Sequence, residues 1–197
     1  MNRLQSVLRQ AASDLTKLRR RWALVGALAV SARAEPRFTR DIDLVIAVDS
    51  DADAERLVRD LQERRYRVQA IVEQVATHRL ATARFVPAGE DEAGVVVDAL
   101  FASSGIEAEV VAAADQLDVL PGLRAPVATT GHLIALKVLA RDDRTRPQDR
   151  VDLVALVAAA APTDLAQARQ AIALIEQRGF HRGKSLAAEL EHFLADR

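Results

Sequence analysis

The sequence predicts an α/β (α+β) fold, a mixed sheet with flanking helices followed by a helical region. Strand-like apolar runs alternate with amphipathic helical segments up to about residue 127. Beyond residue 128 only helical patterns remain. Half of the 197 residues are hydrophobic, which is enough to bury one substantial core or two closely packed subdomains. We therefore predict an α/β core over residues 1–128 and a helical subdomain over residues 129–197.

The predicted core opens with a helix, a short strand and a second helix. The helix, over residues 2–20, places its apolar side chains on one stripe: Leu4, Val7, Leu8, Ala11, Leu15 and Leu18. Residues 22–25 form a short buried strand, Gly26 breaks it, and residues 27–34 resume a helical pattern. A strand, a glycine and a helix in this order direct backbone N–H groups towards a phosphate.

The remaining elements follow from apolar runs and from capping and turn residues. Pro36 and Thr39 mark a loop before a largely buried strand at 41–48, and Ser50 caps a helix that continues to about residue 65. Further elements of the core are strands at 66–72, 79–86 and 94–101, a polar loop at 87–93, a short helix at 104–114, and an extended segment at 117–127 with a Pro-Gly turn. The later helices are expected at 131–141 (capped by Thr130), 147–160, 163–178 and 184–195.

Composition excludes several kinds of protein and site. The chain has no cysteine, which excludes disulfides and thiolate metal sites and favours a reducing cytoplasm. It has no run of about 18 apolar residues, and its first ten residues lack the apolar segment of a signal peptide. The four histidines have no ligand spacing, and no P-loop is present. We therefore expect a cytoplasmic protein without a membrane span.

Charge is unevenly distributed along the chain. Residues 1–40 have nine basic and two acidic side chains, residues 41–120 have seven basic and 17 acidic, and residues 121–197 have 11 basic and nine acidic. An acidic middle between basic ends fits a metal-binding centre beside phosphate-binding surfaces. The alternative is that these charges lie on solvated helix faces.

Three aspartates are candidates for a metal site. Asp41 and Asp43 are two residues apart on one strand, so their carboxylates project from the same face. Two buried like charges need a cation between them, and oxygen ligands suit Mg²⁺ or Mn²⁺. Asp98, in the apolar strand VVVDALF, adds a third carboxylate if the two strands are neighbours, and two metal ions could then bridge a nucleoside triphosphate and an attacking hydroxyl. The alternative is structural: a loop cap, an arginine pair and a strand end.

The segment Arg37-Phe38-Thr39-Arg40 directly precedes this strand. Arg37 or Arg40 could reach a phosphate, and Thr39 could hydrogen-bond near the metal. Alternatively, the two arginines neutralise the neighbouring aspartates.

A lysine in an apolar helix is the next candidate. Lys137 is one of only three lysines, against 24 arginines, and lies in the segment LIALKVLA. A lysine retained in such a context indicates a need for a compact point charge, which a triphosphate would explain. Arg141 follows at i+4 on the same helix face. Asp149 and Asp152 on the next helix could hold these two cations or act on the acceptor; the alternative is a purely structural salt-bridge cluster.

These motifs resemble those of the AbiEii-type nucleotidyltransferase toxins, which include the MenT group. The resemblance covers roughly residues 20–157, in the segments WALVGALAVSARAEPRFTRDIDLVIAV, VVVDALFASSGIEAEVV and GHLIALKVLARDDRTRPQDRVDL. In that family a Gly-Ser pair and a spacer precede an Asp-x-Asp motif, which Gly26, Asp41 and Asp43 match. Ala27 replaces the usual Ser or Gly, which removes a hydroxyl that could hold a phosphate, and 13 residues separate it from Asp41.

The resemblance extends to the downstream residues. The family's helical lysine and following basic residue match Lys137 and Arg141. Its spaced pair of aspartates approximately matches Asp149 and Asp152. Asp98 would be the third strand acid of the wider nucleotidyltransferase fold.

The resemblance implies transfer of a nucleoside monophosphate from a nucleoside triphosphate, with release of pyrophosphate. Asp41 and Asp43 would bind both Mg²⁺ ions, Asp98 would complete the second site, and Gly26, with Ala27, would let the helix N-terminus meet the phosphates. The implied acceptor is RNA, such as a tRNA 3′ end, and the implied partner is a cognate antitoxin. The basic cluster at 19–21 also favours RNA. A small-molecule acceptor such as an aminoglycoside, and a non-catalytic nucleotide-binding or protein-interaction module on the same fold, are the alternatives.

Overall fold

The computed structural model describes residues 3–75, 77–91 and 93–195. The first residue of the predicted 2–20 helix and residue 92 of the predicted 87–93 loop lie outside these ranges.

A seven-stranded sheet forms the centre of the described structure, in the order β3-β4-β5-β2-β1-β7-β6. β2 is parallel to β5 and β1 to β7, whereas the other neighbouring strands are antiparallel. This confirms the predicted mixed sheet. The strands are β1 (Trp22–Val25), β2 (Asp41–Ile46), β3 (Arg67–Glu73), β4 (Leu80–Val86), β5 (Val96–Leu100), β6 (Asp115–Leu120) and β7 (Leu123–Val127).

The helices lie close to the predicted positions. They are α1 (Arg3–Lys17), α2 (Gly26–Arg33), α3 (Asp51–Glu63), α4 (Glu107–Ala112), α5 (Thr130–Ala140), α6 (Pro147–Ala159), α7 (Pro162–Gln177) and α8 (Leu186–Ala195). Ser50 caps α3, as predicted, because its side chain accepts a hydrogen bond from the backbone N–H of Asp53. The predicted cap of α5 was wrong by one residue: the side chain of Thr129 accepts from the N–H of His132.

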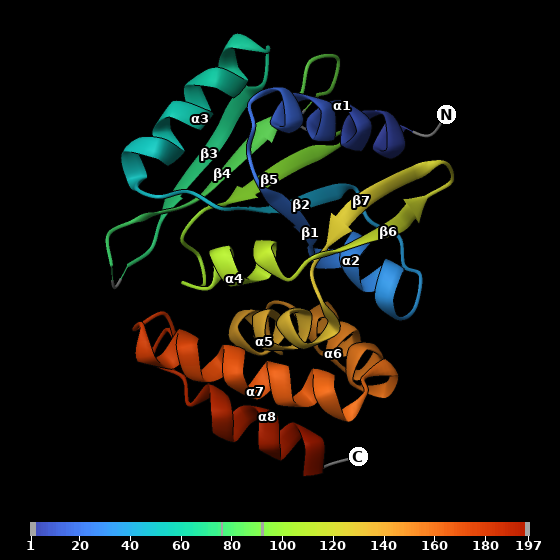
Figure 1. Cartoon of the computed structure of the whole chain (residues 1–197), viewed down its shortest axis with the longest axis vertical. Helices are drawn as coiled ribbons and strands as arrows, with labels where there is room; N and C mark the ends of the chain where they lie inside the picture. Colours follow the sequence, from blue (N-terminus) through green and yellow to red (C-terminus); the bar gives the residue numbers. More distant parts are fainter. Residues whose placement is uncertain (1–2, 76, 92, 196–197) are drawn as a thin grey trace.

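The helices cover the sheet from both sides. Figure 1 shows α1 and α3 on one side of the sheet, and α4 with the stacked helices α5–α8 on the other. Side chains alternate along a strand, so each central strand serves both layers. Leu44 of β2 and Val97 of β5 pack with Ala11 of α1 and Leu61 of α3. Their neighbours Asp43 and Asp98 therefore face the opposite side, towards α5.

The sheet ends at Val127 and the helical layer begins at Thr130. Within the described ranges, no helix combines the length and the apolar character that crossing a membrane requires.

Candidate active site

Strand register places the key charged side chains in one row across the sheet. Asp43 of β2 lies opposite Asp98 of the parallel strand β5, and Asp98 lies opposite Arg84 of the antiparallel strand β4. On the other side of Asp43 lies Val25, the last residue of β1, directly before Gly26. The strand of Asp98 is therefore a neighbour of the strand of Asp43, which is the condition that the sequence left open.

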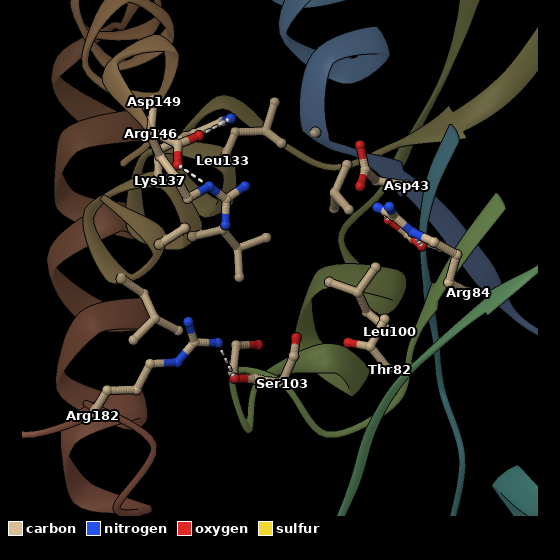
Figure 2. Close-up of a pocket in the computed structure, with 17 residues that line it drawn as sticks. Asp43, Thr82, Arg84, Leu100, Ser103, Leu133, Lys137, Arg146, Asp149 and Arg182 are labelled. Carbon is tan, nitrogen blue, oxygen red and sulfur yellow. Dashed lines mark hydrogen bonds and ion pairs between the residues drawn. The ribbon is translucent and has the colours of Figure 1, made fainter. Parts of the chain in front are cut away.

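This row forms one wall of a pocket of about 360 Å³ between the sheet and the helical layer. In Figure 2, Asp43 and Arg84 lie on one side of the pocket, with Lys137, Arg146 and Asp149 on the other. The charged residues that line it are Asp43, Arg84, Asp98, Lys137, Arg146, Asp149 and Arg182. The pocket therefore brings together residues from both halves of the chain.

Gly26 fits where no other residue can, at the turn from β1 to α2. Its φ of +61° lies in the left-handed region, and a Cβ placed there would stand 1.9 Å from Oδ2 of Asp43. The glycine is thus needed for the close approach of the turn to this carboxylate. The turn also places the N-terminus of α2 beside Asp43, where backbone N–H groups and the helix dipole favour an anion.

Asp43 has an unusual electrostatic environment. Burial raises its pKa from 3.8 to about 7, and the negative charges of Asp98 and Asp41 add to the rise, while Lys137 and Arg146 oppose it. Among the described residues, no side chain donates a hydrogen bond to Asp43 or forms an ion pair with it. A buried carboxylate in this state is suited to binding a cation.

Asp98 differs because it already has a partner. Nε and Nη2 of Arg84 donate to its two carboxylate oxygens at 2.7 and 2.6 Å. The hydrogen bonds to Asp98 are the main cause that raises the pKa of Arg84, and the charges of Asp98, Asp41 and Asp43 contribute. Arg84 is therefore a permanent cation within the acidic row.

The opposite wall of the pocket carries a buried cluster around Lys137. Its Nζ lies 2.7 Å from Oδ1 of Asp149 and 2.7 Å from Oδ2 of Asp152. Arg37 reaches the same cluster from the loop before β2, with Nη2 donating to Asp152 at 3.0 Å, and Arg146 lies 3.0 Å from Asp149. Burial alone would raise the pKa of Asp152, but hydrogen bonds from Lys137 and Arg37 outweigh it, so the net shift is downward.

Several predicted site residues lie outside the pocket. Asp41 is exposed at the start of β2, on the same face as Asp43, and its charge helps to raise the pKa of Asp43. Ala27 is buried in α2 behind Gly26. The hydroxyl of Thr39 bonds the backbone of Asp41, and Arg40 lies near the Phe38 ring and the carbonyl of Ala93, away from the pocket.

Arg141 follows Lys137 as predicted but does not act beside it. α5 ends at Ala140, one residue before the predicted end, and Arg141 is its C-cap, whose N–H still donates to the carbonyl of Lys137. The guanidinium of Arg141, however, pairs with Asp143 and lies in a neighbouring pocket, outside the one that Lys137 lines.

The comparisons with known proteins identify the family of the chain. A model of the family described as "Nucleotidyl transferase AbiEii toxin, Type IV TA system" matches residues 10–197. The chain belongs to this family. It is accordingly a nucleotidyltransferase, and its membership associates it with toxin–antitoxin systems. No curated protein sequence matches it.

Two solved structures share the fold of this AbiEii family member. One is an antigenic nucleotidyltransferase-like protein from Paracoccidioides brasiliensis, 19% identical, with a TM-score of 0.53 over 96% of this chain and 92% of that one. The other is the antibiotic-resistance factor ANT(2'')-Ia, 15% identical, with a TM-score of 0.56 over 98% of this chain and 97% of that one. At these identities the likeness shows the nucleotidyltransferase fold alone.

The carboxylates of Asp41 and Asp43 offer oxygen ligands that would fit a divalent cation. Asp43 and Asp41 project from the same face of β2, and the first has no partner among the described residues. Asp98 does not fit in the same way, because both of its oxygens are taken by Arg84. Accordingly, no group of three or more acidic or histidine side chains in the described ranges is arranged to hold a metal ion.

The sequence reasoning missed other residues of the pocket of this AbiEii enzyme. Arg84 is the one charged residue in the apolar strand LATARFV, the same signal that identified Asp98. Ser103 and Ser104 follow β5 and bond to Glu107, and Arg182 donates to the carbonyl of Ser103 at 3.1 Å. These three come from loops, where no periodicity indicates which way a side chain points.

Proposed function

We propose that this protein uses Mg²⁺ to transfer a nucleoside monophosphate from a nucleoside triphosphate to an RNA acceptor. The observation that carries the proposal is the opposition of two charged groups across one pocket. The sheet wall holds the unpartnered Asp43, and the helix wall holds the Lys137 cluster (Figure 2). A complex of a metal cation with a triphosphate carries both a positive and a negative group. Its cation would fit the acidic sheet wall, and its phosphates would fit the basic helix wall.

The two walls carry opposite net charge. On the sheet side, three carboxylates (Asp41, Asp43, Asp98) face one arginine, Arg84, which leaves a net charge of −2. On the helix side, four cations (Lys137, Arg37, Arg146, Arg182) face two carboxylates (Asp149, Asp152), which leaves a net charge of +2. A divalent cation would therefore bind on Asp41 and Asp43, and phosphate oxygens would face the helix wall.

Each group has a part in the transfer. The acceptor hydroxyl loses its proton to water as its oxygen forms a bond to the α-phosphorus. The bond to the bridging oxygen breaks, and pyrophosphate leaves with that electron pair. Lys137 and Arg146 would bind the negative charge of the departing pyrophosphate. The N-terminus of α2 after Gly26 would bind a phosphate oxygen through its backbone N–H groups. Bound Mg²⁺ would supply further neutralisation of the phosphate charge.

A basic groove beside the pocket supports an RNA acceptor. A second pocket of about 670 Å³ shares Arg146 and Arg182 with the first. Three further cations (Arg141, Arg144, Lys184) and three acids (Asp142, Asp143, Glu189) line it as well, which leaves a net charge of +2. Phosphates of an RNA strand could follow such a groove to the nucleotide site. The basic cluster at residues 19–21 supports RNA less strongly than expected, because it precedes β1 and the pocket lies at the other end of that strand.

The direct test is incubation of the purified protein with each of four α-³²P-labelled nucleoside triphosphates and Mg²⁺. Total tRNA is offered in one arm and an aminoglycoside in the other. Label is expected in the RNA, in amounts that fall as salt rises. Asp43→Asn should abolish it, whereas Asp51→Asn, which alters an acid outside the pocket paired with Arg79, should not. Label in the aminoglycoside alone, or no label in either arm, would contradict the proposal.

Toxin activity belongs to the same proposal. Expression of the wild-type chain should arrest growth, Asp43→Asn should relieve the arrest, and co-expression of a cognate antitoxin should restore growth. Arrest by the Asp43→Asn variant at equal protein level would separate toxicity from nucleotidyl transfer.

A further inference from the structure

Arg84 occupies an unusual position for a cation in a site that binds metal. It lies directly opposite Asp98 in the β4–β5 ladder, and Asp98 lies directly opposite Asp43 in the β5–β2 ladder. Backbone pairing on both sides of Asp98 thus fixes the order of the three side chains. The sheet thus holds the backbone of Arg84, and its side chain, 42% exposed, extends beside Asp98 at the pocket.

The contact between Arg84 and Asp98 is a two-point fork. Nε and Nη2 each donate to one carboxylate oxygen, at 2.7 and 2.6 Å, and the side chain of Asp98 is only 11% exposed. Bidentate pairing of a guanidinium with a carboxylate is geometrically specific and among the stronger ion pairs in proteins. Both oxygens of Asp98 are therefore directed towards a cation that the chain itself supplies.

The charge count of the acidic row points the same way. Asp41, Asp43 and Asp98 bring three negative charges, and Arg84 removes one. The remaining −2 is balanced by one divalent cation. A second divalent cation would give the row a net charge of +2, and it would have to displace a fixed guanidinium from its only carboxylate partner among the described residues.

We propose that the guanidinium of Arg84, held in place by Asp98, stands where a second metal ion would otherwise bind. The protein then takes one divalent cation per chain, on Asp41 and Asp43. Asp98 is a positioning residue that orients Arg84. Arg84 lines the pocket, and its remaining N–H groups, which have no acceptor among the described residues, would bind an oxygen of the nucleotide phosphates or of the acceptor. This inference rests on the proposed function, because it assumes that the carboxylates of β2 bind a divalent cation.

Metal stoichiometry tests the proposal without relying on activity. Mn²⁺ alone is titrated into the full-length protein at pH 8, and bound metal is measured by electron paramagnetic resonance and by calorimetry. The wild-type protein should bind one Mn²⁺ per chain. Arg84→Gln frees the carboxylate of Asp98 and should bind two. The double variant Arg84→Gln/Asp98→Asn removes that ligand again and should return to one.

Arg79→Gln is the matched control, because it breaks an arginine–aspartate pair outside the pocket. It should leave the stoichiometry at one, and circular dichroism in EDTA should show that every variant used is folded. Two Mn²⁺ in the wild-type protein, or one in folded Arg84→Gln, would overturn the role of Arg84 while leaving the nucleotidyl transfer proposal intact. No Mn²⁺ in the wild-type protein would overturn this inference together with the proposed metal on Asp41 and Asp43.

Discussion

Asp43 should destabilise the metal-free protein at neutral and alkaline pH. Its pKa is 3.8 as a free side chain and about 7 in the folded protein, chiefly because the carboxylate is buried and secondly because it lies beside Asp98. A raised folded-state pKa means that the folded chain holds the proton more tightly than the unfolded chain does. Stability from this proton is therefore fully present below pH 3.8 and is lost as the pH rises through 7.

The size of the effect follows from the pKa difference. About three pH units at 1.36 kcal/mol each correspond to a loss of about 4 kcal/mol in the free energy of unfolding between pH 4 and pH 8. Asp43→Asn keeps the shape of the side chain and removes the charge. The substitution should accordingly stabilise the metal-free protein by a few kcal/mol at pH 8 and have little effect near pH 4.

Urea unfolding of the wild-type protein and of Asp43→Asn, in EDTA at pH 4.5, 6 and 8, measures this difference. The two curves should lie close together at pH 4.5 and separate as the pH rises. Addition of Mg²⁺ should stabilise the wild-type protein at pH 8 more than the variant. A difference between the two proteins that does not change with pH would refute the electrostatic reasoning.

Three further substitutions test other parts of the site. Gly26→Ala should lower transfer activity by about 100-fold or more, because the new Cβ would displace the carboxylate of Asp43. It should also reduce thermal stability through about 1–2 kcal/mol of backbone strain. Activity near wild type would contradict the close packing of Gly26 against Asp43. Lys137→Met leaves two buried aspartates without their shared cation and should cost about 3 kcal/mol in urea unfolding at pH 7. Because the pKa of Asp152 is lowered from 3.8 in the folded protein, this deficit should shrink as the pH falls below about 4. A deficit constant with pH would exclude the ion pairs as its cause. Thr129→Val removes the cap of α5 and should lower the free energy of unfolding by about 1 kcal/mol, whereas Thr130→Val should lower it less. Equal losses for the two variants would contradict the assignment of Thr129 as the cap.

Local sequence patterns were enough to predict most elements of the fold. The 41–48 strand was predicted from an alternating start and an apolar run, and the structure has β2 over Asp41–Ile46. The shared orientation of Asp41 and Asp43 could also be predicted, because residues two apart on a strand lie on the same face. The edge strand β6 begins two residues before the predicted 117–127 segment, because Asp115 and Gln116 are exposed and polar and carry no apolar signal, yet they pair with β7.

Partners across the sheet could not be predicted in the same way. The sequence places Asp98 in an apolar strand but does not say which strands flank it, so the pairing with Arg84 emerged only from the β4–β5 register. The partner of Arg141 was hidden for a different reason. Residue 141 is the C-cap of α5, and its guanidinium pairs with Asp143 in the loop that follows, a contact that no helical period predicts.

The two walls of the pocket contribute to stability in opposite directions, and this explains how nucleotide binding can depend on both halves of the chain. The helix wall stabilises the empty protein, since Lys137 and Arg37 satisfy the buried carboxylate of Asp152 and tie the loop before β2 to α6. The sheet wall leaves Asp43 unpartnered among the described residues at a cost of a few kcal/mol, which a bound cation would recover. The metal–triphosphate complex proposed above would gain free energy at the sheet wall through its cation and would meet an already ordered positive surface at the helix wall. Loss of Arg37 should therefore weaken nucleotide binding even though it leaves Asp41 and Asp43 unchanged.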